Sequence, residues 1–360
     1  MTPLNGPDYK RFLGEDVVPE EELSTCIESR RGVASFLLAV SLWLFAGHAN
    51  AQLPDLAEVS GQYVPPAELV SRPPAKVGMT AFNASANLPI PLSNRTFLIP
   101  GLAYHFDSLS YSDTPPNFTE LRAFHSVEAP LLAVQLLPND WALSVRLAPG
   151  LAGDFLGFDI GLLHLSALVL GTHSFSSHFS LGGGAIVTYA FGSLLLLPAV
   201  SIDWKPLDGV QVLAFVPVLF SAKYTIGGRL EIGVRADIGG NSYSIRDSRV
   251  TDVWPCVANA SDNPATPANE AAANPAECID HVAYSVGVAG AQVGVRLFDS
   301  IWWTAFAGAT IYRRLDQQNI NNDPISGGEL TIPNEFVVRS SLAWRIPIDS
   351  RGTDKGSSVQ

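Results

Sequence analysis

Three histidines stand among several serines in the run "HLSALVLGTHSFSSH", at His164, His173 and His178. Histidine beside serine is the pair that activates the nucleophile of Ser/His hydrolases. No fixed spacing supports a triad here, and the chain lacks Gly-x-Ser-x-Gly, His-Glu-x-x-His, phosphate-loop and dinucleotide motifs. We therefore expect no enzyme, no catalytic residues and no cofactor, with a lipid-active enzyme as the least favoured alternative.

Charged residues inside otherwise apolar segments are the stronger lead. They occupy alternate positions, opposite the apolar side chains: Glu128, Arg146, Asp203, Lys205, Glu231, Arg235, Asp237, Arg296, Arg339 and Arg345. An ion that leaves water without gaining a partner is strongly destabilising. Such groups therefore either pair with one another or line a water-filled path, and the elements that carry them decide which.

The segment "GRLEIGVRADIGG" at residues 228–240 shows the pattern of these elements most plainly. Its apolar side chains alternate with Glu231, Arg235 and Asp237. A period of two predicts a β-strand with one apolar and one charged face. The segments "DWALSVRLA" and "EFVVRSSLAWRIPI" repeat it, and helical periodicity is almost absent after Gln52. We expect an all-β domain.

Strands of this kind suit two architectures. In a soluble sandwich the apolar faces point inward, whereas in a membrane barrel they face lipid and the interior can be polar. Short turns alternate with long connections at about 246–281 and 315–333, and small residues crowd the second face, both of which favour an antiparallel transmembrane β-barrel. Aromatic residues also gather near expected strand ends, as lipid-interface girdles require: Tyr63, Tyr104, Trp141, Trp204, Tyr224, Tyr243, Trp302, Trp303, Tyr312 and Trp344.

Three short motifs accompany this layout: "NLPIPL" at residues 87–92, "WKP" at 204–206 and "VPV" at 216–218. With them, the chain resembles outer-membrane β-barrel proteins of Gram-negative bacteria, particularly a poorly characterised family. The resemblance covers nearly all of residues 52–348, and it implies the fold and an outer-membrane location but no chemistry. One departure is the polar tail that follows the last strand, where such barrels usually end on an aromatic residue. Either Trp344 is read by the barrel assembly machinery, or recognition is atypical.

The number of strands follows from counting. Thirteen segments read as strands, from about 56–64 to about 334–348, with one of them at about 209–222. A single-chain bacterial barrel has an even number, so one segment is wrong. If the turn "FDS" faces the periplasm, counting back places the turns "LPND" and "LSNR" outside. The short segment at 56–64 is the weakest, so we expect 12 strands, with 10 or 14 as alternatives.

Residues 30–52, "RRGVASFLLAVSLWLFAGHANAQ", have the order of a secretory signal peptide. An arginine pair precedes an apolar run of 14 residues and a small-residue cleavage site between Ala51 and Gln52. The run is shorter than the roughly 20 residues of a membrane-spanning helix. We expect a signal peptide at 30–51, a barrel at 52–348 and a polar tail at 349–360. Residues 1–29 are acidic, so they are either a mis-assigned start or a disordered extension.

Removal of residues 1–51 leaves 27 acidic and 18 basic residues, a net charge of −9. This balance offers no basic cluster for nucleic acid. Only Cys256 and Cys278 remain, and in an exported chain we expect them to form a disulfide that closes a loop rich in Ala, Asn and Pro. Of further ligands only His281 is close, so no metal site is expected.

These features lead to two hypotheses for function. The first is a passive pore or transporter for a small solute of unknown identity. The second is a non-conducting structural or surface-interaction barrel, whose charges only fill and stiffen the interior. Twelve strands lie between the filled small barrels and the open 16-stranded porins, so both remain open. The expected partners are outer-membrane lipid, the barrel assembly machinery and the solute.

Overall fold

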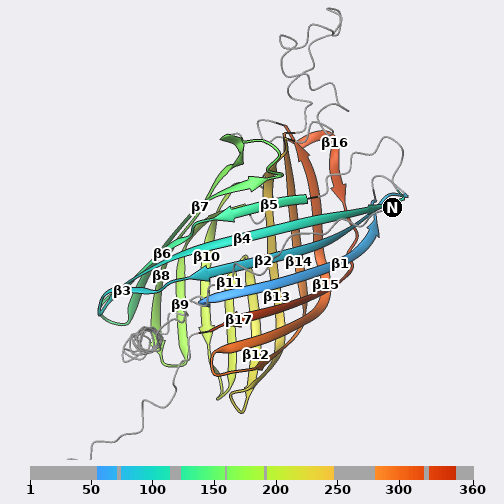
Figure 1. The fold of residues 1–360 in the computed structure, drawn as a ribbon. Helices are drawn as coiled ribbons and strands as arrows, with labels where there is room; N and C mark the ends of the chain where they lie inside the picture. The colour runs from blue at the N-terminus through green and yellow to red at the C-terminus, as the bar shows by residue number, and fades with distance from the viewer. Residues whose placement is uncertain are drawn as a thin grey trace, which may run out of the picture. The chain divides into compact units, whose positions relative to one another are not determined.

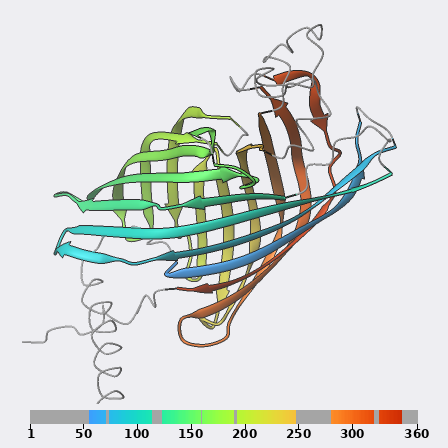
Figure 2. The ribbon, with the colours of Figure 1, turned by 45° about the horizontal axis from the view of Figure 1, so that its top comes forward.

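The computed structural model describes residues 55–70, 74–113, 123–158, 160–189, 193–246, 280–319 and 324–345. They belong to one compact unit, His48–Thr353, and their strands close into an antiparallel barrel (Figures 1 and 2). The expected extension at 1–29, signal peptide at 30–51, cleavage site at Ala51 and Gln52, cysteines Cys256 and Cys278 and tail at 349–360 lie outside the described residues. In the described ranges, no helix has the length and hydropathy of a membrane span.

The strands follow one another around the barrel in chain order, with one short 3₁₀ helix between β7 and β8. Their bounds are β1 Ala57–Glu68, β2 Lys76–Asn87, β3 Ile90–Ser93, β4 Thr96–Ser112, β5 Ala123–Glu128, β6 Leu131–Leu136, β7 Trp141–Gly153, η1 Ile160–Leu162, β8 Leu163–Ser176, β9 Phe179–Thr188, β10 Leu195–Trp204, β11 Val210–Val216, β12 Leu219–Ile226, β13 Leu230–Ser244, β14 His281–Arg296, β15 Ile301–Gln318, β16 Pro324–Thr331 and β17 Phe336–Trp344.

In three cases, two consecutive elements are parts of the same strand of the barrel wall. β2 and β3 both pair with β4, β5 and β6 both pair with β4 and β7, and β16 and β17 both pair with β15. The seventeen elements of the described ranges therefore make fourteen strands, and β1 closes the ring against β17. Fourteen is an even number, as a single-chain bacterial barrel requires.

The expectation of 12 strands is wrong, and the alternative of 14 is observed. The discounted segment at 56–64 is β1, a strand of 12 residues that pairs on both sides. The expected strand at 209–222 is instead the hairpin β11–β12, in which Val218 N donates to Phe215 O at 2.8 Å. Its turn, Pro217 and Val218, lacks the Asn or Gly that marks most two-residue hairpins, and its flanks are apolar. The sequence therefore reads as one continuous strand.

The corrected strand count also changes the end of the barrel to which the turns are assigned. The turns "LSNR", "LPND" and "FDS" all lie with Asp55 and Arg345 at one end, the termini end, so placing the first two outside is wrong. The opposite end, where β13 connects to β14, is called the loop end below. In "LPND", Asn139 and Asp140 have φ of 58° and 60°, the left-handed conformation that a tight hairpin needs.

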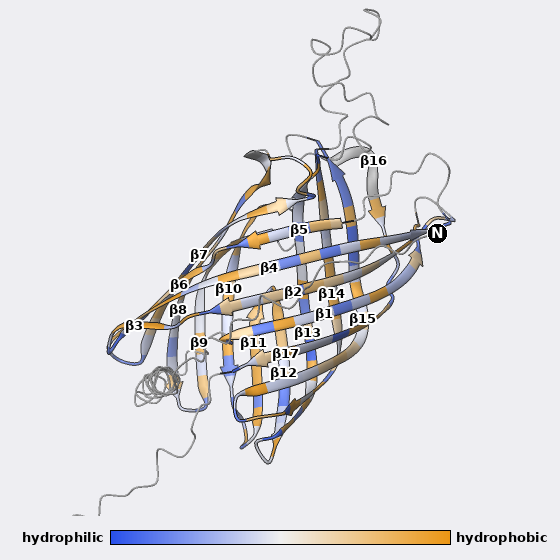
Figure 3. Ribbon diagram, viewed as in Figure 1, coloured by the Kyte–Doolittle hydropathy of each residue, from blue (hydrophilic) through white to orange (hydrophobic). Residues whose placement is uncertain are grey.

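The outer face of the barrel is apolar. On β13, Ile232 and Val234 are 42% and 50% exposed, whereas Glu231 is 9% exposed. Figure 3 shows the same alternation of apolar and polar residues along most strands. A sheet that turns its apolar side chains outward over this much surface is suited to contact with lipid.

Part of the expected aromatic girdle is present near the termini end. Five side chains there are 40–49% exposed: Trp141, Trp204, Tyr224, Trp303 and Trp344. The expectation of an outward girdle position is wrong for two residues, because Tyr243 is fully buried and Trp302 is only 9% exposed. Trp302 precedes the outward Trp303, and Tyr243 donates a hydrogen bond to the inward Asp107, so both point into the barrel.

Candidate functional site

The inner face of the barrel divides into two halves of different chemistry. Because residues paired across a ladder point to the same side, the register carries the inner face from strand to strand. One half, here called the polar half, comprises β13, β14, β15, β17, β1, β2, β4 and β5. The other, the apolar half, comprises β6 to β12. Its large inward residues are Leu132, Val134, Leu136, Leu168, Leu170, Ile186, Leu195, Leu197, Leu213, Phe215 and Leu219.

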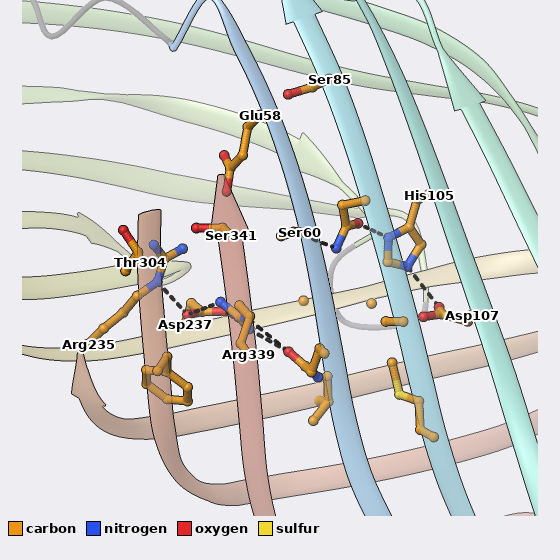
Figure 4. Close-up of a pocket in the computed structure, with 18 of the residues that line it drawn as sticks. Glu58, Ser60, Ser85, His105, Asp107, Arg235, Asp237, Thr304, Arg339 and Ser341 are labelled. Atoms are coloured by element: carbon orange, nitrogen blue, oxygen red, sulfur yellow. Dashed lines mark hydrogen bonds and ion pairs between the residues drawn. The ribbon is translucent and has the colours of Figure 1, made fainter. Parts of the chain in front are cut away.

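A cavity of about 300 Å³ lies against the polar half (Figure 4). Its wall includes carboxylates, guanidinium groups, a histidine and several hydroxyls from seven strands. The labelled residues in Figure 4 are Glu58, Ser60, Ser85, His105, Asp107, Arg235, Asp237, Thr304, Arg339 and Ser341. The cavity therefore presents both signs of charge within one space.

Asp237 is the centre of the first interaction network. Arg235 Nε donates to Asp237 Oδ1 at 2.7 Å, and Arg339 Nη1 and Nη2 donate to its two oxygens at 3.1 and 3.0 Å. Arg339 also donates from Nε and Nη2 to Gln62 Oε1, at 3.0 and 2.7 Å. Two guanidinium groups thus share one carboxylate, which leaves one positive charge in excess.

His105 and Asp107 form the second network, on the inward positions of β4. His105 Nδ1 contacts Asn83 Oδ1, and His105 Nε2 lies 2.9 Å from Asp107 Oδ2. Asn83 in turn donates to Ser60 Oγ at 3.4 Å. Asp107 is 1% exposed and accepts a further hydrogen bond from Tyr243 Oη at 2.7 Å. Because Tyr243 belongs to β13, this network joins opposite walls of the barrel.

A third cluster lies at the termini end. Glu231 accepts from Lys223 Nζ at 3.0 Å and from Arg345 Nη1 at 2.9 Å. The Arg345 guanidinium also stands over the ring of Trp302, 4.8 Å from its centroid, as in a cation–π contact. Glu231 is thus shared by two cations, and the second of them, Arg345, also lies 3.9 Å from Asp55 Oδ1.

A fourth cluster is centred on Glu128, at the end of β5. Its two oxygens lie 3.3 Å from Arg146 Nη2 and 3.2 Å from His164 Nε2. Of the other two histidines of the Ser/His run, His173 packs outside against Trp141, with 4.9 Å between centroids, and His178 contacts Ser177 Oγ in the turn after β8. The three histidines therefore do not share a site.

Three expected lumen charges take no part in these clusters. Among the residues that the structure describes, Asp203 accepts one side-chain hydrogen bond, from the amide Nε2 of Gln211 at 3.0 Å. Lys205 follows the last residue of β10, and Arg296 is the last residue of β14. In the described part of the chain, no group of three His, Cys, Asp or Glu side chains is placed to hold a metal ion.

Several residues of the site escaped sequence reasoning, namely Glu58, Gln62, Asn83, His105, Asp107 and Lys223. His105 and Asp107 carried a usable signal, because in "YHFDS" they alternate with apolar Phe106 as Arg235 and Asp237 alternate with Ala236. The uncharged amides Gln62 and Asn83 carried no such signal in the sequence.

The loop end of the polar half is closed by contacts across the barrel. Ser244 of β13 pairs with Gly153 of β7, a strand of the opposite wall, and Asp154 N donates to Ser244 O at 3.1 Å. A Cβ on Gly153 would lie 2.6 Å from Ser244 O, so only glycine permits this approach. Beneath the bridge the rings of Phe124 and Tyr243 stack with 4.9 Å between centroids. These rings belong to a buried apolar cluster, here called the roof, which also includes Val286 and Phe306 of the cavity wall.

Residues 47–253, more than half of the chain, match the family model described as "Domain of unknown function (DUF6268)". The chain belongs to this family. The match includes all three motifs on which the expected resemblance rests, and it agrees with the expectation of a poorly characterised family. No curated protein matches this DUF6268 chain by sequence.

Solved structures that match this chain include two proteins described as channels and one described as a porin. An outer membrane channel from Pseudomonas putida F1 is 10% identical with a TM-score of 0.39, covering 81% of this chain and 96% of that chain. The NanC porin is 9% identical with a TM-score of 0.32, over 80% and 99%. A mutant of the TodX monoaromatic hydrocarbon channel is 8% identical with a TM-score of 0.31, over 84% and 93%. Similarity at this level carries no function to the DUF6268 chain.

Proposed function

We propose that this chain is a barrel of the Gram-negative outer membrane that gives small solutes slow passage through its lumen, without covalent chemistry. One observation carries the proposal: charged side chains inside the barrel remain accessible. The side chains of Arg339, Arg146 and Arg235 are 19%, 34% and 39% exposed although they point inward. A filled interior would bury them, so their exposure supports a hydrated path.

The location in the outer membrane rests on the same structure. The apolar outer face, the aromatic residues at the termini end and the even number of strands support it. Outer-membrane lipid, the barrel assembly machinery and an unidentified small solute remain the expected partners.

A non-conducting structural or surface-interaction barrel is the second candidate. The bridge between Ser244 and Gly153 favours it, together with the stacked rings of Phe124 and Tyr243, because these contacts close the loop end of the polar half. In that case the ion pairs would serve to hold the interior walls together.

Recording from the purified mature barrel in planar lipid bilayers tests the choice. We expect small current steps with little preference for K⁺ over Cl⁻, because the lumenal charges nearly balance. The non-conducting structural barrel is the better account if no current appears and if the double substitution Glu231→Gln with Arg235→Gln lowers thermal stability without opening a current. The proposed passage of solutes is then rejected.

A further inference from the structure

The cavity of the polar half has the volume of a small solute. Its 300 Å³ would hold about ten water molecules at roughly 30 Å³ each. Met79, Val286 and Phe306 contribute apolar surface to one part of the wall, beside the charged groups. The cavity is therefore suited to a molecule that has both charged and apolar parts.

The positive side of the cavity is Arg235. Its Nε is its one described donor to protein, and the acceptor Asp237 is already neutralised by Arg339. The Nη groups of Arg235 therefore keep their donors for the lumen, and its side chain is 39% exposed. A guanidinium with two free Nη groups is well suited to binding a carboxylate through paired hydrogen bonds.

The negative side of the cavity is Glu58 on β1. In the described part of the chain its carboxylate has neither an ion pair nor a hydrogen bond, and it points into the cavity beside Ser341 (Figure 4). The other two carboxylates of the wall are engaged, Asp107 with His105 and Asp237 with the two arginines. One cation and one anion thus face the same space without contacting each other.

We propose that this cavity binds a small zwitterion with an apolar portion, such as an apolar amino acid, with its carboxylate on Arg235 and its ammonium group on Glu58. Such a solute satisfies both charges at once and adds no net charge to the lumen. Its apolar portion lies against Met79, Val286 and Phe306. The inference names a solute class for the proposed passage, but binding itself requires no net transport.

Isothermal titration calorimetry of the mature barrel in detergent micelles at pH 7 tests the proposal. The probes are two isomeric zwitterions, L-leucine and 6-aminohexanoic acid, which differ in the spacing of their charges. The single-charge analogues are 4-methylpentanoate and 3-methylbutylamine. At least one zwitterion should bind about tenfold more tightly than both analogues, because each charged hydrogen bond contributes that order of affinity. Equal or weaker binding of both zwitterions overturns the proposal, whatever the variants do.

Two substitutions assign the charges. Arg235→Met should weaken zwitterion binding about tenfold while leaving the affinity for 3-methylbutylamine unchanged. Glu58→Gln should also weaken zwitterion binding about tenfold, while leaving the affinity for 4-methylpentanoate unchanged. The matched controls are Arg229→Met, in the exposed turn before β13, and Glu68→Gln, at the exposed end of β1, neither of which should alter binding. Loss of binding in the controls as well contradicts the assignment.

The outcome is separable from that of the proposed function. If the barrel binds a zwitterion but carries no current, the proposed site stands and the proposed passage of solutes is rejected. If the barrel conducts but binds neither zwitterion more tightly than the single-charge analogues, the proposed passage stands and the proposed site is rejected.

Discussion

The two halves of the barrel interior present similar apolar faces to the outside but differ in what they turn inward. The polar half holds ion pairs under a packed apolar roof, and its strands are long, with 16 residues in β14 and 18 in β15. The apolar half turns leucines toward the lumen, and its strands include β11 and β12 with 7 and 8 residues. Much of the charge inside the barrel thus lies where neighbouring or facing strands bring a partner of opposite sign.

The comparison shows where the interior is held together by side chains. In the polar half, Asp237 and Asp107 each join two or more strands, and the roof buries Phe124 to 1% exposure. In the apolar half, inward residues such as Leu213 and Phe215 are neither fully buried nor paired with an opposite wall. Stability of the polar half should therefore depend on its inward side chains, whereas the apolar half depends on the ladder and on lipid contact.

The largest expected effect is that of Phe124→Ala. Truncation of a buried phenylalanine costs about 3 to 5 kcal/mol, and this ring also stacks on Tyr243 across the roof. Leu213→Ala is the matched change in the apolar half, and it should cost about 1 kcal/mol because its side chain borders the open lumen. The free energy of unfolding by urea from lipid vesicles measures both. Equal losses would show that the leucine face is packed as well.

Asp237→Asn should have the next largest effect. The substitution leaves Arg235 and Arg339 side by side without their shared carboxylate, and breaking such a pair costs about 3 kcal/mol. Asp203→Asn in the apolar half should cost about 1 kcal/mol or less, because Asp203 accepts one amide hydrogen bond. The same urea titration compares the two. A loss as large at Asp203 would remove the distinction between the halves.

Tyr243→Phe is expected to cost about 2 kcal/mol. It keeps the ring stack on Phe124 but removes the donor to Asp107 Oδ2, and a hydrogen bond to a buried charged group is worth roughly that amount. Tyr224→Phe, on the lipid side, is the control and should change stability by less than about 0.5 kcal/mol. If both variants unfold like the unaltered barrel, the cross-barrel hydrogen bond contributes nothing to closure.

The sequence was sufficient to predict the architecture, because alternation depends only on which face meets lipid. The strand number was harder, since it depended on the turn at Pro217 and Val218. That turn has neither Gly nor Asn, and apolar strands flank it. Conversely, the Gly227–Gly228 turn, with φ of 57° and 66°, is the kind that a sequence displays.

The candidate site was predictable only within single strands. Arg235 and Asp237 stand two positions apart and were expected to share a face, and they form an ion pair at 2.7 Å. Their third partner, Arg339, lies 102 residues further along the chain than Asp237. Tyr243 of β13 and Asp107 of β4 are 136 residues apart, and they meet near the point where β13 pairs across the barrel with β7. Alternation assigns a residue to a face but does not specify which strands meet across the lumen.

The smallest expected effect concerns the loop end, where Arg246 contacts Asp154 of the apolar half and Asp280 of the polar half. Arg246 follows β13, and its backbone N donates to Asp154 Oδ2 at 2.7 Å, while its Nη1 donates to Asp280 Oδ1 at 2.9 Å. Asp280 precedes β14 and therefore lies beyond the strands that would span the membrane. Although burial raises the pKa of Asp280, the hydrogen bond from His281 and the charge of Arg246 outweigh it, so its pKa is lowered overall.

The sign of the pH dependence follows from this lowered pKa. A carboxyl group with a depressed pKa in the folded state stabilises the fold above its unfolded pKa, about 3.9, and loses that contribution as pH falls through the folded value. We therefore expect Asp280→Asn to lower the free energy of unfolding by less than about 1 kcal/mol at pH 7, and we expect this loss to shrink as the pH falls below about 3.9. Urea midpoints of the two proteins at pH 7, 5 and 3 measure the difference. If it stays constant down to pH 3, Asp280 contributes through its shape and hydrogen bonding rather than its charge, and an ionic contribution of the Arg246–Asp280 pair should be discarded.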